Sequence, residues 1–457
     1  MLFNSQIFIL AFLPLALALY YLVADRHRAR QVVLIAASLV FYAYWSVAAL
    51  PLLVGLTLAN WVFIQLYGRG GGRFWPWLGL ALNFAVLGVF KYANFFASQV
   101  AALFGQTHTP WDIILPLGIS FFVFQKISYL VDLTRGDRRI YGFLDFFTFV
   151  TFFPQLIAGP IVRHNEIVEQ FAASPRRPEM WENLSRGAVL FVIGLVKKTG
   201  IADTMAAVCD PLFHSAATGP LNGTEAWAAV SSFTLQIYYD FSGYSDMAIG
   251  LALMFGLRLP FNFDAPYRAT SIRDFWRRWH ITLSRILRDY LYIPLGGNRA
   301  GATRQAANVI VTMLLGGLWH GANWTFVAWG GLHGIALAVN GAWQRRGWPM
   351  PAPLGWALTL LFVMAAWVLF RSSSFAIAAD MLGSMAGLHG WGNAKFDNLD
   401  VAAAAALVAI VGPTSQQFAL GSLRPRRWLA VPAAVGLVYM LLLIGGRAQH
   451  EFIYFQF

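Results

Sequence analysis

Apolar runs long enough to cross a lipid bilayer recur along this chain, with short arginine-rich segments between them. A helix needs about 20 mostly apolar residues to span the hydrocarbon core, and runs of this kind cover residues 7–24, 75–95 and 431–444 with its flanks. Only 12% of the 457 residues are charged, far below the roughly 25% that is typical of a soluble domain. The chain is therefore predicted to be an all-α, polytopic membrane protein.

The arginine clusters between the apolar runs indicate how the chain crosses the membrane. Cytoplasmic loops are rich in Lys and Arg, and this rule assigns to the cytoplasm the clusters at residues 26–30, 69–73, 135–139, 345–346 and 424–427. The first apolar run has no basic leader and no small-residue cleavage site, so we expect it to remain as the first span. We expect about eleven transmembrane helices, with interfacial and re-entrant helices besides, in a single membrane-embedded domain over residues 1–457.

The net charge of +12 does not indicate nucleic-acid binding, because the basic residues are scattered among the expected membrane loops and form no aromatic-basic module. The single cysteine, Cys209, excludes an intramolecular disulfide and a cysteine-rich metal site. Its neighbour Asp210 is not a cation that would activate the thiol. A phosphate-binding P-loop, a dinucleotide fingerprint and a hydrolase nucleophile elbow are all absent from the sequence.

A dense run of Arg and Trp, RDFWRRWHITLSRILRDY at residues 273–290, interrupts the apolar pattern. On one continuous helix, Trp276, His280, Leu283 and Leu287 share a face, and the arginines lie beside or opposite it. A helix of this kind is typical of the membrane interface. His280 is then expected on the apolar stripe, either as a reactive group or as a buried partner of the Trp residues or a headgroup contact.

The strongest candidate for a reactive group is His320, in the motif GGLWHGANW at residues 316–324. Residues 305–344 contain no Asp, Glu, Lys or Arg, and an ionisable group at membrane depth marks a pathway or a reactive centre by default. The alternative is a histidine that hydrogen-bonds a neighbouring helix. Three neighbouring glycines allow either backbone or substrate to approach closely, two tryptophans can exclude solvent, and an asparagine can reach the same face if the segment is helical there. These residues are Gly316, Gly317, Gly321, Trp319, Trp324 and Asn323.

Polar residues in two other apolar segments are candidates for lining a substrate path. In YYDFSGYSD, residues 238–246, the candidates are Asp240, Tyr244 and Asp246, which either orient a histidine and bind substrate hydroxyls or pair with arginines to hold helices together. In PQLIAGP, residues 154–160, the candidate is Gln155, where the prolines either break a helix beside a cavity or only kink it.

The remaining candidates are expected to be structural. His333 lies thirteen residues after His320 in a glycine-rich span, and we expect it, like His164 and Cys209, to be satisfied within the core. His280 and His320 are forty residues apart and no acidic residue adjoins either of them. This spacing is not that of a zinc motif, so no metal is predicted.

An isolated, desolvated histidine without a neighbouring serine or cysteine nucleophile favours acyl transfer from a thioester to an alcohol. A neutral imidazole accepts the hydroxyl proton as the oxygen attacks, which contributes about 10²- to 10⁴-fold to the rate. A dry pocket also suppresses competing hydrolysis. On this hypothesis His320 is the general base.

The sequence resembles the membrane-bound O-acyltransferase family. The resemblance lies in LPLGISFFVFQKISYLVD (115–132), FFPQLIAGPIVR (152–163), YYDFSGYSDMAIG (238–250), NFDAPYRATSIRDFWRRWHITLSRILRDYLYIPLGGNR (262–299), GGLWHGANWTFVAWGGLHG (316–334) and the terminal FIYFQF. Within the family these blocks are most similar to the membrane subunit of alginate O-acetyltransferases, and D-alanyl-teichoic-acid transferases are relatives.

The resemblance implies a many-helix fold in a bacterial inner membrane with a central funnel or tunnel, and it implies that His320 is catalytic and His280 the second family position. It implies transfer of acetyl groups from a cytoplasmic thioester, with acetyl-CoA as the plain choice and no bound cofactor. Periplasmic acetyltransferase partners would then place the group on an alginate-like exopolysaccharide.

Three alternatives stay open from the sequence. The first is transfer of another acyl group, such as D-alanine, to a cell-envelope polymer. The second is a proton-coupled transporter that uses Asp240, Asp246 and the histidines as a relay, although the two halves show no matching pair of broken segments. The third is a non-catalytic scaffold of a polysaccharide secretion complex.

Overall fold

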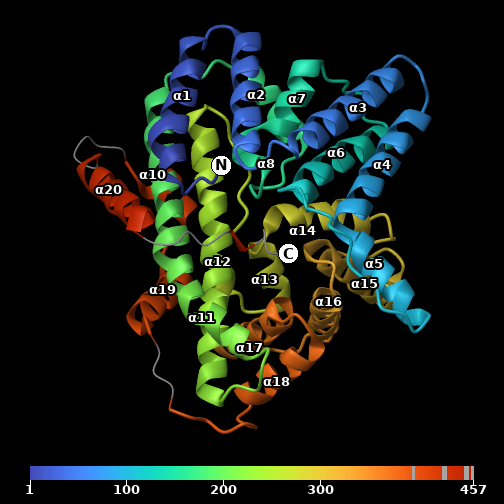
Figure 1. Ribbon diagram of the computed structural model, residues 1–457, viewed down its shortest axis with the longest axis vertical. Helices are drawn as coiled ribbons and strands as arrows, with labels where there is room; N and C mark the ends of the chain where they lie inside the picture. Colours follow the sequence, from blue (N-terminus) through green and yellow to red (C-terminus); the bar gives the residue numbers. More distant parts are fainter. Residues whose placement is uncertain (394–396, 425–429, 447–451, 454–457) are drawn as a thin grey trace. The chain divides into compact units, whose positions relative to one another are not determined.

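The computed structural model describes the chain except for residues 394–396, 425–429, 447–451 and 454–457, and every regular element in the described part is a helix (Figure 1). Two predicted features therefore lie partly outside the described residues, namely the cluster at 424–427 and the terminal FIYFQF. The chain divides into two compact units. Unit 1 comprises Met1–Ile193, Tyr244–Pro260 and Ala419–Gly446, and unit 2 comprises Gly194–Gly243, Phe261–Phe418 and Arg447–Phe457.

Unit 1 is built mainly from the first half of the chain. Phe41 of α2 packs against Phe3 and Phe153, with ring centroids 5.4 and 5.5 Å away, so an aromatic cluster forms part of its core. Its elements are η1 (Phe8–Phe12), α1 (Leu13–Leu22), α2 (His27–Ala43), α3 (Leu50–Gly68), α4 (Phe74–Leu87), η2 (Gly88–Tyr92), α5 (Ala93–Leu103), α6 (Ile119–Thr134), α7 (Phe143–Thr151), α8 (Phe153–Leu156), α9 (His164–Ile167), η3 (Val168–Ala172), most of α10 (Met180–Leu195) and of η7 (Gln417–Ser422), and α20 (Ala430–Gly446).

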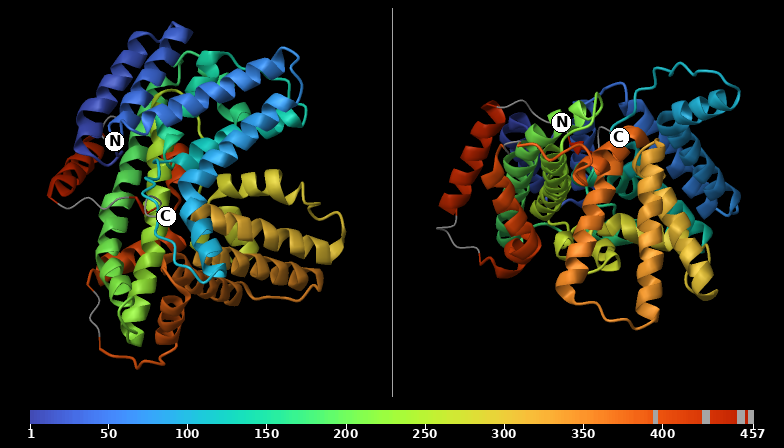
Figure 2. Two further views of the ribbon diagram at one scale, coloured as in Figure 1. Left: turned by 45° about the vertical axis from the view of Figure 1, so that its right-hand side comes forward. Right: turned by 90° about the horizontal axis from the view of Figure 1, so that it is seen from below.

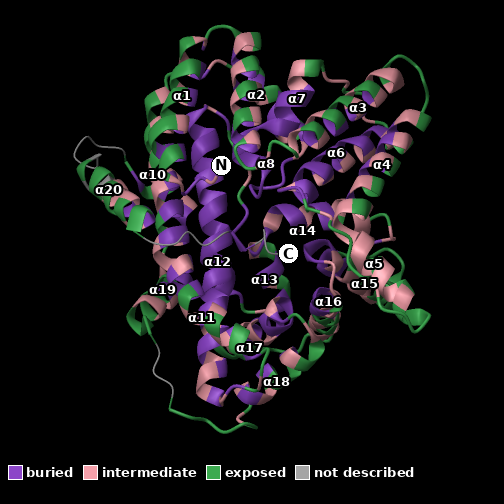
Figure 3. Ribbon diagram, in the orientation of Figure 1, coloured by how far each residue is buried: buried purple, intermediate pink, exposed green. Residues whose placement is uncertain are grey.

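Unit 2 contains the two histidine motifs. Its elements are η4 (Val196–Ala202), α11 (Asp203–Ser215), the first part of α12 (Gly223–Met254), η5 (Pro266–Arg268), α13 (Ile272–Arg278), α14 (Ile281–Leu287), η6 (Arg288–Tyr292), α15 (Gly301–His320), α16 (Trp324–Arg345), α17 (Ala352–Arg371), α18 (Phe375–Met385) and α19 (Leu399–Val411). Helix α12 is buried for most of its length, including its polar residues Asp240 and Asp246 (Figure 3).

Among the described residues, three helical stretches are long and apolar enough to cross a bilayer: Leu50–Gly68, Phe74–Leu103 and Ala352–Arg371. Shorter apolar helices cover Phe8–Leu22, Phe375–Met385, Leu399–Val411 and Ala434–Gly446. These helices agree with an all-α membrane protein, but the predicted count of about eleven spans is not confirmed.

Helices α15 and α16 lie side by side as a hairpin that carries the GGLWHGANW motif (Figures 1 and 2). A Cβ atom at Gly317 would stand 2.2 Å from the carbonyl oxygen of Phe326, and one at Gly330 would stand 2.1 Å from that of Met313. Small residues let membrane helices approach closely. Gly317 of the motif and Gly330 of α16 are therefore needed for helix packing, whereas the sequence alone also left open an approach by substrate.

Replacing Gly330 with alanine is expected to destabilise unit 2, because backbone atoms of Met313 occupy the place of the new methyl group. We expect a loss at or above the usual 1–3 kcal/mol range for overpacking, measured as a lower midpoint of thermal unfolding in detergent. Gly331→Ala is the matched control, because its Cβ would meet only the end of the Leu314 side chain, at 3.1 Å. Equal midpoints for the two variants would contradict the packing argument.

Candidate functional site

His320 is the last residue of α15 and is only 4% exposed. The helix ends there because Gly321 adopts an extended backbone, with φ −159° and ψ 148°, and Asn323 then caps the start of α16. The side-chain oxygen of Asn323 accepts a hydrogen bond from the backbone N–H of Thr325. The buried imidazole is thus fixed at the turn of the helical hairpin.

Aromatic rings surround the His320 imidazole. The ring centroids of Trp319, Trp329 and Phe370 lie 5.0, 5.2 and 5.4 Å from it. Trp329 and Phe370 were not recognised in the sequence, because they lie nine and fifty residues away on α16 and α17. Trp324, which was expected to exclude solvent here, is 50% exposed, so that expectation was wrong. We call His320 with Trp319, Trp329 and Phe370 the aromatic chamber.

The expected continuous helix around His280 is broken, and this prediction was wrong. α13 ends at Arg278 and α14 begins at Ile281, with His280 between them at φ 42°, in the left-handed region. Such a backbone is uncommon for residues other than glycine and persists only where surrounding contacts impose it. The heptad-like spacing of Trp276 and His280 therefore does not place them on one helical face.

Asn262 imposes this turn. Its backbone oxygen accepts from the N–H of Ile281 at 2.9 Å, and its side-chain oxygen accepts from the hydroxyl of Thr282 at 2.9 Å and from the N–H of Thr282 at 3.3 Å. The Nδ1 atom of His280 lies 3.0 Å from the same oxygen. Because an amide oxygen only accepts, His280 carries its proton on Nδ1, which makes Nε2 the basic nitrogen.

The structure brings the two predicted histidines together. The imidazole centroids of His280 and His320 are 6.3 Å apart, and the ring of Trp319 lies 6.1 Å from His280. Both histidines are buried, and Phe241 packs edge-on against His280 at 4.6 Å. Two imidazoles from segments forty residues apart thus share one buried aromatic environment, of the kind in which a neutral imidazole can act as a base without competition from bulk water.

Asn323 does not continue the helical face of His320, since α15 has already ended. Besides capping α16, its side-chain nitrogen donates to the backbone oxygen of Ser373 at 2.9 Å. These two bonds give Asn323 a role in holding the hairpin turn, and they leave its role toward substrate a prediction.

Asp240 forms a buried ion pair, which the sequence left as one of two alternatives. Its Oδ1 lies 2.6 Å from the ammonium of Lys198, which is also 2.8 Å from Asp203. Its Oδ2 accepts from the backbone N–H of Ile453 at 2.8 Å. The partner is a lysine and not one of the many arginines. A buried carboxylate with a cation and a backbone donor ties several segments of unit 2 together.

The other polar candidates belong to unit 1. Tyr244 is buried and stacks on Phe3 with centroids 4.7 Å apart, and Asp246 is buried two residues further along α12. Gln155 lies in the four-residue helix α8, where its Nε2 donates to the oxygen of Phe149 at 2.6 Å. Its Oε1 is buried without a hydrogen-bond partner among the described residues. The helix is broken at this point and not only kinked, and the cavity expected beside the break stays a prediction.

The residues that were expected to be structural are in contact with polar groups of neighbouring residues. His333 is buried and accepts on Nδ1 from the indole N–H of Trp276, at 3.2 Å. Cys209 is buried and lies 2.9 Å from the side-chain oxygen of Gln236. His164 lies between the hydroxyl of Tyr141, at 3.0 Å, and the carboxylate of Asp132, at 3.2 Å. In the described parts of the chain, no three His, Cys, Asp or Glu side chains are arranged to hold a metal ion.

The amino-acid sequence matches a known protein family over the region that forms this site. Residues 72–377 match the model of the membrane-bound O-acyltransferase family, a range that contains both histidines and the aromatic chamber. The chain is 45% identical over 403 residues to a probable alginate O-acetylase of Pseudomonas putida, which covers 86% of this chain and 81% of that protein.

Two further relatives have names that state a different acceptor polymer or a different transferred group. A peptidoglycan O-acetyltransferase of Helicobacter pylori is 42% identical over 426 residues, covering 85% of this chain and 80% of its own. A teichoic acid D-alanyltransferase of Streptococcus thermophilus is 29% identical over 239 residues, covering 50% of this chain and 58% of its own.

Proposed function

Because the chain belongs to the membrane-bound O-acyltransferase family, we propose that it transfers acetyl groups from a cytoplasmic thioester into the O-acetylation of an extracytoplasmic polysaccharide. The observation that carries this proposal is the pair of buried imidazoles, 6.3 Å apart, beside the aromatic chamber. We place the protein in the inner membrane of a bacterium, crossing it several times.

In the proposed reaction His320 is the general base. Its imidazole accepts the proton of the acceptor hydroxyl while the oxygen attacks the carbonyl carbon of the thioester. The carbon–sulfur bond then breaks, and the imidazolium returns the proton to the departing thiolate, so that an ester and a thiol are formed. The chamber of Trp319, Trp329 and Phe370 excludes water, which would otherwise compete as the acceptor.

His280 is proposed to bind and orient the acceptor hydroxyl in the same reaction. Its Nδ1 proton is held by Asn262, which makes Nε2 the basic nitrogen, and in the proposed role Nε2 accepts a hydrogen bond from the acceptor hydroxyl and orients it. Trp319 packs beside both imidazoles. Asn323, Asp240, Tyr244, Asp246 and Gln155 remain proposed as residues along the substrate path.

Acetyl-CoA is the proposed donor, as a substrate and not as a resident cofactor. Since the final acceptor is a polymer outside the membrane, the acetyl group is proposed to pass to extracytoplasmic acetyltransferase partner proteins. Two polymers are supported as the acceptor by the relatives' names, an alginate-like exopolysaccharide and peptidoglycan. D-Alanine as the transferred group is supported only by the more distant relative.

Deleting the gene is expected to remove O-acetyl groups from one cell-envelope polymer, and wild-type complementation is expected to restore them. The measurement is ester-linked acetate and D-alanine, released by mild base from separately purified exopolysaccharide and peptidoglycan. Loss of acetate from a single fraction identifies the acceptor. Loss of D-alanine instead would replace acetyl with D-alanyl transfer, and unchanged esters in both fractions would move the protein to the transporter or scaffold alternatives.

A further inference from the structure

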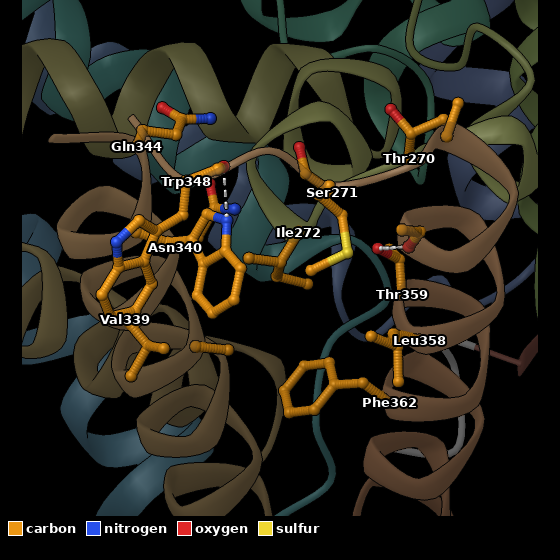
Figure 4. A pocket seen from close by; sticks show the side chains of 15 residues that line it. Thr270, Ser271, Ile272, Val339, Asn340, Gln344, Trp348, Leu358, Thr359 and Phe362 are labelled. Atoms are coloured by element: carbon orange, nitrogen blue, oxygen red, sulfur yellow. Dashed lines mark hydrogen bonds between the residues drawn. The ribbon is translucent and has the colours of Figure 1, made fainter. Parts of the chain in front are cut away.

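A groove of about 460 Å³ opens in unit 2 between α16 and α17, at the end where the two helices are joined (Figure 4). Asn340 and Trp348 line one wall, and Leu358, Thr359 and Phe362 of α17 line the other, with Ser271 along the upper edge. Its volume is in the range of small-molecule sites, and neither catalytic candidate histidine lines it.

The flanks of the groove are exposed and apolar. Ile335 and Val339 of α16 are 50% and 60% exposed, and Leu354 and Leu358 of α17 are each 50% exposed. α17 is one of the stretches that are long and apolar enough to cross a bilayer. Because apolar residues exposed on a spanning helix face lipid, the groove opens toward the acyl chains of the bilayer.

The joined end of the groove is cationic. The guanidinium of Arg346 stacks over Trp348, 4.9 Å from the ring centroid, and Arg273 donates to the side-chain oxygen of Gln344 at 3.0 Å. Both Trp348 and Gln344 line the groove, and none of its lining residues is acidic. The charge pattern of the sequence places this end on the cytoplasmic side, where anionic phospholipids meet basic pockets between helices.

One polar atom of the groove lacks a partner. The side-chain oxygen of Asn340 is buried and makes no hydrogen bond among the described residues. An unsatisfied buried oxygen is unfavourable, so a ligand that supplies an O–H donor at this position is favoured over one that does not. A choline headgroup offers no such donor, whereas a glycerol headgroup does.

We propose that this groove binds one molecule of an anionic phospholipid with a hydroxylated headgroup, of the phosphatidylglycerol class. One acyl chain lies along the apolar wall of Leu358 and Phe362. The phosphate lies at the end formed by Arg346 and Arg273, and a headgroup hydroxyl donates to the side-chain oxygen of Asn340.

The proposed lipid would contact the same aromatic packing that encloses His320. The ring of Phe362, at the inner wall of the groove, lies 5.2 Å from that of His333, which lies 4.8 Å from Trp329. Trp329 is part of the aromatic chamber. An acyl chain against Phe362 thus fills space next to the packing that positions the candidate base.

The test is native mass spectrometry of the full-length, delipidated protein with phosphatidylglycerol or phosphatidylcholine of identical acyl chains. We expect phosphatidylglycerol to be retained with a stoichiometry of one. The double variant Arg273→Gln with Arg346→Gln is expected to weaken its apparent affinity by about tenfold or more. Arg69→Gln with Arg73→Gln is the matched control for net charge, since these arginines lie in the α3–α4 loop of unit 1.

Two further variants test the groove itself. Asn340→Leu is expected to abolish the preference for glycerol over choline headgroups, and Ala336→Phe is expected to fill the groove and block both lipids. Thermal unfolding without added lipid checks that each variant is folded. If Ala336→Phe does not fold, Asn340→Leu alone is sufficient to test the groove. The proposal would be overturned if the wild type retained both lipids equally, or if Asn340→Leu kept the preference for phosphatidylglycerol. It would also be overturned if soluble glycerol 3-phosphate raised the midpoint of thermal unfolding as much as phosphatidylglycerol does.

Discussion

Replacing His320 with alanine is expected to abolish acyl transfer while the protein stays folded and inserted in the membrane. Removing a general base typically costs about 10²- to 10⁴-fold in rate, and the dry surroundings of His320 leave no bulk water to replace it. The measurement is the ester content of the acceptor polymer in a deletion strain that expresses the variant, with membrane abundance measured in parallel.

Trp324→Ala is the matched control for His320→Ala, because Trp324 lies in the same hairpin turn but is half exposed and outside the aromatic chamber. We expect this control to retain acylation near the wild-type level. Wild-type acylation by His320→Ala would reject the role of His320 as the base. Loss of acylation in both variants would instead point to a defect in the turn between α15 and α16.

The sequence predicted those features that depend on local composition. Apolar runs between arginine clusters predicted helices in a membrane, because burial of a run of this length in lipid does not depend on tertiary detail. The uncharged sequence around His320 also predicted its burial, because an apolar stretch of this length is buried in lipid or protein whatever its tertiary contacts are. Gly317 of its motif was recognised, but its packing role became visible only with the facing backbone of α16.

Features that depend on contacts between distant segments were missed or wrong. The spacing from Trp276 to Leu287 predicted one helix, yet hydrogen bonds accepted by Asn262, eighteen residues before His280, hold the left-handed turn that breaks it. Helical periodicity is a local signal and tertiary hydrogen bonds override it. Likewise, Lys198 as the partner of Asp240 and Phe370 as a wall of the chamber come from segments that no sequence spacing connects to them.

The second large effect is expected at His280. His280→Ala should reduce acyl transfer more strongly than His333→Ala, although both histidines are fully buried and both contact tryptophans. The reason is position, since the imidazole of His280 lies next to that of His320, whereas His333 packs against Trp329, which in turn packs against His320. Initial rates of ester formation in membranes, at equal protein abundance, measure the difference, and a larger loss in His333→Ala would show that the second histidine was chosen wrongly.

Asn262 provides a sharper form of the same prediction. Asn262→Leu removes the acceptor that holds the Nδ1 proton of His280 and the left-handed turn, so we expect it to lower the rate through His280. Residues that act as one unit are not additive. The double variant Asn262→Leu with His280→Ala should therefore transfer acyl groups no more slowly than His280→Ala alone. If the two losses multiply, Asn262 acts on the fold independently of His280, and its assignment as a positioning residue fails even where that of His280 stands.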